Sequence, residues 1–389
     1  MWRCILAQAV PLTVAQLVQL LYNVVDRVYI GHMDGSNGLA LTGVGLTFPV
    51  ITLIMAFTAL FGPGGVPLFS MARGAGDTEK ARRILGNSFA LLLTTAAVLT
   101  VAGYLFCRPI LFAFGASEAS YVYAKAYLDI YLIGTVFSMT ATGLNGYINA
   151  QGFPKIGMYS TVIGAVTNII LDPVFIFVFD MGVAGAALAT VLSQGVSAVW
   201  VLRFLFSDKP PVALTRDCIR ADRKTTGQIL KLGTANFIMQ GTNFLVQVTC
   251  NSTLQLFGGD LFVGIMTVTN SVREIFMLPV SGIVSGAQPV ISFNYGAKAY
   301  DRVRSGIRFN TFMGAAYNTL YWVLIVLFPR FWFSIFSDDA ATIAAGVGAL
   351  NITNTIPTYP SRAMIHCPAP LSTFNPEIRT PVQKINSPR

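Results

Sequence analysis

Two carboxylic acids lie inside long apolar segments of this sequence, where an ionisable side chain is costly. Asp26 falls near the end of the first apolar segment, and Asp172 falls well inside the fifth. Placing a charge at the centre of a membrane-spanning helix costs about 2.5–3.5 kcal/mol on insertion scales, so each position is a candidate for function. Burial disfavours the charged form of a carboxyl group, which suits such a group to carrying a proton.

Asp26 belongs to a polar stripe on the first apolar segment. Gln16, Gln19, Asn23 and Asp26 follow one another at intervals of three, four and three residues. This spacing places them on one face of a helix. Asp26 also lies about one turn from the end of the segment, a position from which it can reach interfacial water instead. Because it shares a face with three amide side chains, we expect Asp26 to point into a helix bundle.

Asp172 has an amide side chain one helical turn before it. Asn168 is placed to hydrogen-bond the carboxyl group, and Pro173 removes a backbone donor and so loosens the helix beside it. Thr161 and Ala165 share this face. The alternative is that Asn168 and Asp172 only clamp neighbouring helices through hydrogen bonds.

The polar stripe recurs 224 positions later, in the apolar segment at about 229–257. The matching residues are Gln240, Asn243, Gln247 and Cys250. A second match aligns residues 73–82 with 295–304, so that Gly74 corresponds to Gly296. Six apolar segments separate the copies, an even number, so both copies run in the same direction through a membrane. Such parallel repeats are typical of transporters, which bind their substrate between the two halves.

Composition identifies a membrane protein. Of the 389 residues, 54% are hydrophobic and only 11% are charged, and the mean hydropathy is +0.62. Apolar stretches of about 20 residues must cross the bilayer as helices, because unpaired backbone groups cannot face lipid. The fold class is therefore all-α, a polytopic membrane protein built from two parallel-repeat helix bundles.

The charged and metal-binding residues exclude several other classes. The net charge of +9 comes from short loops and forms no basic face for nucleic acid. The five cysteines are far apart in the sequence and there are two histidines, so neither a disulfide framework nor a metal site is indicated. The sequence lacks HExxH, GxSxG and any paired catalytic set, so we expect no enzyme activity and no cofactor.

Loop charges predict the orientation of the chain. We expect spans at about 5–30, 39–62, 84–106, 119–148, 157–179, 183–206, 229–257, 263–290 and 305–328, with a tenth starting near residue 340. Basic residues gather in the loops after the even-numbered spans: Arg73, Lys80, Arg82, Arg83, Lys155, Lys209, Arg216, Arg220, Arg223, Lys224, Lys298, Arg302 and Arg304. The positive-inside rule then places these loops and the N-terminus in the cytoplasm.

Four regions follow from this pattern. Residues 1–206 form an N-terminal six-helix bundle, 207–228 a basic cytoplasmic linker and 229–356 an incomplete second bundle. Residues 357–389 are rich in proline and cannot continue a membrane helix. Two further ionisable residues, Arg273 and Glu274, fall near the middle of the eighth span, where they form either a structural ion pair or part of a substrate cavity. Lys125 and Asp129, four residues apart, predict an interfacial ion pair.

Several separated motifs together resemble one family. They are Pro11 with the stripe from Gln16 to Asp26, the loop starting Arg73-Gly-Ala-Gly-Asp, the segment from Asn149 to Lys155, and Asn168-Ile-Ile-Leu-Asp172-Pro. In order and spacing they resemble the multidrug and toxic compound extrusion (MATE) transporters, particularly the DinF-like prokaryotic branch. That family has twelve helices in two bundles, whereas this sequence loses its apolar pattern during the tenth, which suggests a truncated or frame-shifted C-terminus.

The resemblance implies a function and a set of site residues. It implies a monomeric, multi-pass protein of the plasma membrane that exports cationic, amphipathic compounds in exchange for protons, with Na⁺ as the alternative coupling ion. Protons are preferred because NorM-type relatives have a cation-binding acidic residue in the seventh helix. The seventh span of this sequence has no Asp or Glu, and it has Cys250 at the repeat position. The implied coupling residues are Asp26, Asp172 and Asn168. The expected cavity residues are Gln16, Gln19, Asn23, Thr190, Gln240, Asn243, Gln247, Arg273 and Glu274.

Two other functions remain open at this stage. A related family of flippases for lipid-linked sugars shares the bundle plan, but a sugar diphosphate calls for cavity arginines, and only Arg27 and Arg273 lie at a suitable depth. The other possibility is a truncated product that does not transport.

Overall fold

All regular secondary structure in the described part of the chain is helical, as expected from composition. The computed structural model describes residues 1–31, 43–114 and 116–334, and no strand occurs among them. In chain order the elements are α1 (Trp2–Gly31), α3 (Phe48–Gly74), α4 (Thr78–Ala113), α5 (Glu118–Ala150), α6 (Pro154–Pro173), η1 (Val174–Val178), α7 (Gly182–Leu205), η2 (Arg216–Cys218), α8 (Arg223–Gly296), α9 (Tyr300–Leu327) and α10 (Pro329–Ser334).

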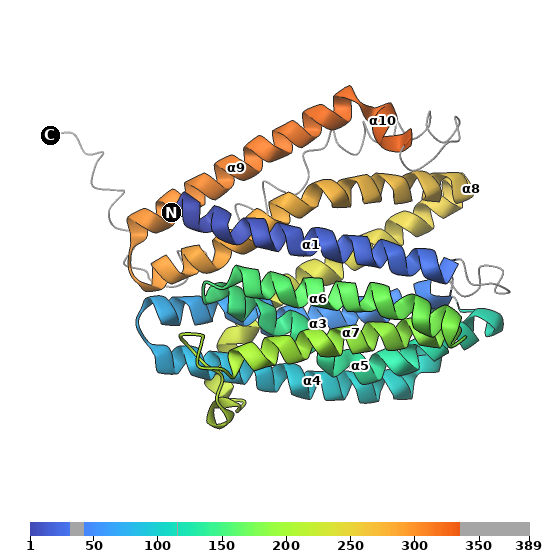
Figure 1. Ribbon diagram of the computed structural model, residues 1–389. Coiled ribbons are helices and arrows are strands. Elements are labelled where there is room, and N and C mark those ends of the chain that lie inside the picture. The colour runs from blue at the N-terminus through green and yellow to red at the C-terminus, as the bar shows by residue number, and fades with distance from the viewer. Residues whose placement is uncertain (32–42, 115, 335–389) are drawn as a thin grey trace. The chain divides into compact units, whose positions relative to one another are not determined.

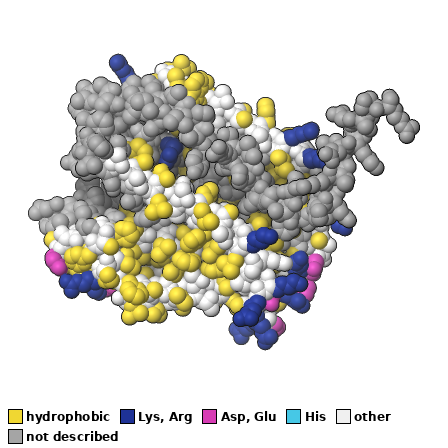
Figure 2. Space-filling model, turned by 180° about the vertical axis from the view of Figure 1, so that it is seen from behind, with side chains coloured by type: hydrophobic (Ala, Val, Ile, Leu, Met, Phe, Trp, Pro, Cys, Tyr) yellow, Lys and Arg dark blue, Asp and Glu magenta, His cyan; other side chains and the backbone are white. Residues whose placement is uncertain are grey.

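Six stretches of the described residues are long and apolar enough to cross a membrane. They are Trp2–Tyr22, Gly43–Gly74, Thr78–Ala113, Pro154–Val178, Gly182–Leu205 and Phe276–Gly296. The expected fourth span, α5, is not among them, because it carries many Ser, Thr, Tyr and Asn residues. Apolar side chains cover much of the surface in Figure 2, and charged side chains gather toward its edges.

The chain divides into two compact units, which are described separately. Unit 1 comprises residues 1–253 and 281–304, and unit 2 comprises 254–280 and 305–389. Within unit 1, α1 and α3 to α7 run side by side along a common direction (Figure 1). These helices fall within residues 1–206, the segment predicted to form an N-terminal bundle.

Helix α5 lies at the centre of unit 1, in contact with α3, α4, α6 and α7. Glycines allow the closest approach, because a methyl group on Gly62 of α3 would lie 2.6 Å from the Cα of Gly143 in α5. Beside this crossing, the buried hydroxyls of Tyr147 and Ser88 are hydrogen-bonded at 2.6 Å. The packing at this crossing thus combines close backbone contact with hydrogen-bonded polar groups.

The helix that carries Asp172 changes its geometry at Pro173, as expected from the missing backbone donor. Helix α6 ends at this residue, and the π-helical turn η1 follows directly. Single π-turns of this kind are frequent at functional sites.

The predicted internal repeat is present in the backbone of unit 1. After α3, Gly76 has a left-handed φ of 79°, and at the matching position after α8 Lys298 has φ 58°. The hydrogen bonds of the two turns also match, because Asp77 N donates to Ala72 O and Ala299 N donates to Asn294 O, both at 3.0 Å. Lys298 adopts a conformation that favours glycine.

Helix α8 is continuous where the sequence pattern predicted a break near residues 258–262. It runs from Arg223 to Gly296 over 74 residues. Near its start Gly233 packs against Leu60, and near its end Gly286 packs against Ala9. A straight helix would separate these two contacts by about 80 Å, more than the length of any other helix in unit 1. Helix α8 therefore reverses direction between them, as two spans require.

The predicted basic linker at 207–228 runs into α8, which begins at Arg223, and its residues 207–222 are bound to the helices of unit 1. Val212 N donates to Gln151 Oε1 at 2.9 Å, and Val212 and Leu214 are buried. Asn87 of α4 donates to Asp222 O at 3.2 Å, and the Asp222 carboxylate caps α8 by accepting from Thr225 N at 2.9 Å. The predicted boundary is therefore a fixed connection.

Other predictions fall on α5 and on unit 2. Lys125 and Asp129 form the expected ion pair. In unit 2, the Phe276 ring of α8 lies 4.8 Å from both Tyr321 and Trp332, measured between centroids. The expected tenth span near residue 340 and the proline-rich tail lie outside the described residues.

The crossing of α3 and α5 gives a stability prediction. Gly62→Ala places a methyl group 2.5 Å from Gly143 O, and overpacking of this kind costs about 1–3 kcal/mol. We expect a lower free energy of unfolding, measured as a lower apparent melting temperature in detergent. Gly195→Ala is the control, because the nearest atom, in the Phe137 ring, is 3.9 Å away. An unchanged Gly62→Ala melting temperature would contradict this packing.

Candidate functional site

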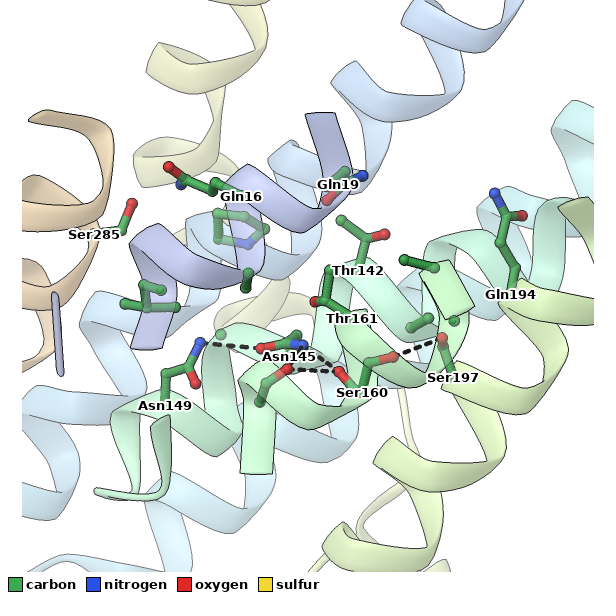
Figure 3. Close-up of a pocket in the computed structure, with 18 of the residues that line it drawn as sticks. Gln16, Gln19, Thr142, Asn145, Asn149, Ser160, Thr161, Gln194, Ser197 and Ser285 are labelled. Carbon is green, nitrogen blue, oxygen red and sulfur yellow. Dashed lines mark hydrogen bonds between the residues drawn. The ribbon is translucent and has the colours of Figure 1, made fainter. Parts of the chain in front are cut away.

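A cavity of about 370 Å³ lies inside unit 1. Helices α1, α3, α5, α6, α7 and the last part of α8 line it, and Figure 3 shows its polar side chains converging from several helices. Its size is that of a pocket for a small organic molecule.

The cavity wall is partly polar, and it carries no formal charge among the described residues. Amide, hydroxyl and phenol groups provide its polar atoms, and small or apolar residues fill the rest of the wall. The polar lining residues are Gln16, Gln19, Tyr22, Thr142, Asn145, Asn149, Ser160, Thr161, Ser193, Gln194, Ser197, Ser285 and Gln288. Such a wall offers many hydrogen-bonding positions without fixing a counter-ion.

Asn145 organises the part of the wall formed by α5 and α6. Its Nδ2 atom donates to Gly157 O at 2.9 Å and to Ser160 Oγ at 2.6 Å. Because the Gly157 carbonyl can only accept, this contact fixes the Asn145 amide, whose oxygen then accepts from Asn149 Nδ2 at 3.0 Å. Ser197 of α7 donates to Ser160 O at 2.8 Å and ties the third helix to the same network (Figure 3).

Three buried amide oxygens on this wall have no hydrogen-bond partner among the described residues. They are Gln16 Oε1, Asn149 Oδ1 and Gln194 Oε1. The orientation of Asn149 follows from the Asn145 network, so its open atom is an acceptor. The cavity therefore suits a ligand that donates hydrogen bonds or carries positive charge.

The predicted pair of Asn168 and Asp172 lies on α6, and both side chains are buried. Asn168 Nδ2 donates to Asp172 Oδ1 at 3.1 Å and lies 3.5 Å from Thr190 Oγ1 of α7. In the described part of the chain, Asp172 Oδ2 has no hydrogen-bond partner. One carboxyl oxygen is thus held by an amide while the other is available for a proton.

Asp26 also interacts with this pair, and we call Asp26, Asn168 and Asp172 the carboxyl cluster. It interacts electrostatically with Asp172 and with Tyr127 of α5. Tyr127 is buried and lies near Thr190. The two carboxyl groups therefore influence each other electrostatically, although they lie 146 residues apart in the sequence.

A pair of tyrosines connects the carboxyl cluster to the cavity. The rings of Tyr127 and Tyr131 are stacked, with centroids 5.9 Å apart and planes at 16°. Tyr131 lies near Gln194, which lines the cavity. From the other side, Tyr22 also lines the cavity and interacts electrostatically with Asp26. A change of charge at the carboxyl groups can therefore alter the electrostatic potential at the cavity wall.

The residues predicted for the substrate cavity occupy different places. Gln16 and Gln19 line the cavity, and Thr190 lies beside Asn168. Gln240 lines a separate apolar pocket of about 330 Å³ between α3, α4 and α8. Asn243 is exposed on α8, and Arg273 is exposed in unit 2. The side chains of Asn23, Gln247 and Glu274 lie outside the described residues.

Sequence reasoning missed most of the cavity wall. Asn145 and Asn149 are four residues apart, and so are Ser193 and Ser197. This helical spacing of polar residues within apolar segments is the signal that would have found them. Tyr127 and Tyr131 have the same spacing, but tyrosine is common at membrane interfaces and gave no comparable signal.

The described residues contain no group of three His, Cys, Asp or Glu side chains that could hold a metal ion. A bundle of apolar helices with a partly polar cavity and a buried carboxyl group is typical of a membrane transporter. The sequence model of the MatE family matches residues 11–174 and 235–367. The chain therefore belongs to the MatE family, whose members are transporters and not enzymes.

Individual relatives agree with this assignment. Multidrug export protein MepA of Staphylococcus saprophyticus subsp. saprophyticus is 24% identical over 350 residues, which cover 89% of this chain and 76% of that protein. MepA of Staphylococcus haemolyticus is 23% identical over 347 residues, with the same two coverages. A solved structure of a multidrug resistance MATE family transporter in an outward-facing conformation has a TM-score of 0.83 at 24% identity. The match covers 90% of this chain and 78% of the chain in that structure, and this likeness establishes the fold.

The contact between Asn168 and Asp172 can be tested by a double-mutant cycle. We expect Asn168→Ala to lower the free energy of unfolding by about 1–3 kcal/mol, because it removes the amide donor from a buried carboxyl group. Combined with Asp172→Ala, it should show a coupling energy of about 0.5–3 kcal/mol. Asn168→Ala with Glu118→Ala is the control, because Glu118 is exposed on another helix and pairs with Arg108. Additive effects at 168 and 172 would contradict the contact.

Proposed function

We propose that this protein is a multidrug efflux antiporter that exports cationic, amphipathic compounds in exchange for protons. The observation that carries the proposal is a partly polar, uncharged cavity that lies near two carboxyl groups, of which Asp172 is buried, with tyrosines between the cavity and the carboxyl groups. The export of drugs by the MepA relatives, as their names state, is consistent with it.

The polarity of the cavity supports a cationic substrate. The open amide oxygens accept hydrogen bonds, and no lysine or arginine is among the described residues that line the wall. A sugar diphosphate would need cationic partners, so this lining favours the export of cations over the flipping of lipid-linked sugars.

The carboxyl cluster supports coupling to protons. In the proposed cycle, protonation of Asp26 and Asp172 from outside removes negative charge and weakens the binding of a cation. Release of the protons to the cytoplasm restores the charge and allows the next substrate to bind. A change in protonation can drive transport only if the two protein states bind the proton with different affinity. The π-turn after Pro173 is the element next to Asp172 that can adjust.

The proposal includes an orientation. The basic loops after α3, α5, α7 and α8 place the N-terminus in the cytoplasm by the positive-inside rule. We expect the protein to act as a monomer in the plasma membrane.

The test is dye export by the protein in liposomes under an imposed pH gradient or an imposed Na⁺ gradient. We expect ethidium export with the pH gradient and little with the Na⁺ gradient alone. Asp26→Asn and Asp172→Asn should each reduce pH-driven export at least tenfold, because each removes a proton-binding group and keeps the side-chain shape.

Asp129→Asn is the matched control, because it makes the same chemical change at an ion pair outside the cavity. It should keep its export. Export by Asp26→Asn at the rate of the unaltered protein would refute proton coupling through this residue. Export driven by the Na⁺ gradient and not by the pH gradient would make Na⁺ the coupling ion in place of the proton.

A further inference from the structure

We propose that three glycine contacts related by the internal repeat form the cytoplasmic closure of the cavity. In this proposal the contacts are made in the state seen here and separate when the cavity opens to the cytoplasm. The inference rests on the proposed transport function, because only a transporter needs such an opening. All the residues concerned belong to unit 1.

The first contact joins the ends of α3 and α8 at the two glycines that the repeat aligns. A methyl group on Gly74 would lie 2.8 Å from the carbonyl carbon of Phe293. A methyl group on Gly296 would lie 2.7 Å from the carbonyl carbon of Met71. Met71 and Phe293 each lie three residues before their own glycine, so the contact is reciprocal. The two halves meet here around a local two-fold axis.

A second pair of contacts obeys the same symmetry. A methyl group on Gly64 of α3 would lie 2.6 Å from the Cα of Gly233 in α8, and one on Gly286 would lie 2.8 Å from Ala9 N in α1. The repeat aligns Gly64 with Gly286, and Ala9 with Gly233. Each half therefore presents the same two surfaces to the other half. Backbones approach this closely only where side chains are absent.

These contacts border the cavity. Pro63 and Val66 line it on either side of Gly64, and Ser285 and Gln288 line it on either side of Gly286. Gly74 and Gly296 lie further along the same two helices, at the ends that carry the basic loops. We call these three glycine contacts the seam. The seam therefore lies between the cavity and the predicted cytoplasmic side.

Arg73 adds an independent contact across the seam. Its guanidinium carbon lies 5.6 Å from the centroid of the Phe293 ring, a cation–π distance. Its Nη1 atom donates to Ala150 O at 2.6 Å, next to the cavity residue Asn149. Arg73 thus holds α3 and the end of α5 to α8. Both contacts can be lost without unfolding a helix, as expected for a closure with two states.

The test measures access to the cavity from each side, without substrate or gradient, so that it does not depend on coupling. The five native cysteines are replaced by alanine, and Thr161→Cys places a reporter thiol on the cavity wall. A membrane-impermeant maleimide is applied to inverted and to right-side-out vesicles. We expect Gly74→Ala and Gly296→Ala each to speed labelling in inverted vesicles roughly tenfold, since overpacking shifts the seam toward separation.

Gly195→Ala and Gly241→Ala are matched controls, because a methyl group meets only ordinary contact at Gly195 and open space at Gly241. Both should label at the rate of the reporter protein. If the seam variants fail to fold, Arg73→Gln decides, because it removes the bridge without a clash and should also speed labelling from that side. Unchanged labelling in every folded seam variant overturns the proposal, as does faster labelling only in right-side-out vesicles. If labelling changes as expected while pH-driven export is absent, the proposed coupling is wrong and the closure stands.

Discussion

The structure depends on one constraint: inside a bilayer, a polar group must find its partner within the protein. Backbone groups meet this constraint by forming helices, and polar side chains meet it only on faces that point away from lipid. Asn145, Asn149 and Ser160 therefore partner one another across α5 and α6. The same constraint accounts for the hydrogen bond that the Asn168 amide donates to the Asp172 carboxyl group. The cavity exists where these partnered faces do not fill the space between the helices.

The internal repeat shows which features the fold requires and which the function requires. The turns after α3 and α8 keep the same hydrogen bonds, although Gly76 is replaced by Lys298 at the left-handed position. The close contacts of Gly64 and Gly286 are also kept. The titratable group is not kept, because Cys250 stands where the first copy has Asp26. The backbone geometry is thus the same in both copies of the repeat, whereas the carboxyl groups of the cluster occur only in the first copy.

The general fold could be predicted from the sequence because hydropathy, loop charge and spacing are local signals. They gave the helices, the repeat and the break at Pro173. Gln16 and Gln19 line the cavity because an amide side chain on an apolar helix finds no hydrogen-bond partner on a lipid-facing side. The prediction for Gln240 rested on symmetry alone. The structure places Gln240 in a different, apolar pocket.

The rest could not be predicted because it depends on contacts between distant residues. The reversal of α8 needs the packing of Gly233 and Gly286 against other helices. The link from Asp26 through Tyr127 and Tyr131 to Gln194 involves three helices, and no spacing rule connects them. The closeness of Asp26 and Asp172 followed only from a family resemblance, since residues 146 positions apart carry no local signal.

The central claim is that substrate and protons compete through the carboxyl cluster. The most direct measurement counts the protons released when tetraphenylphosphonium binds to the purified protein in weakly buffered detergent solution. The account predicts net proton release on binding, and its loss in Asp172→Asn, because the cation and the proton favour opposite charge states of the cluster. Binding of the cation with unchanged affinity and without proton release, across the pH range in which export occurs, would contradict it.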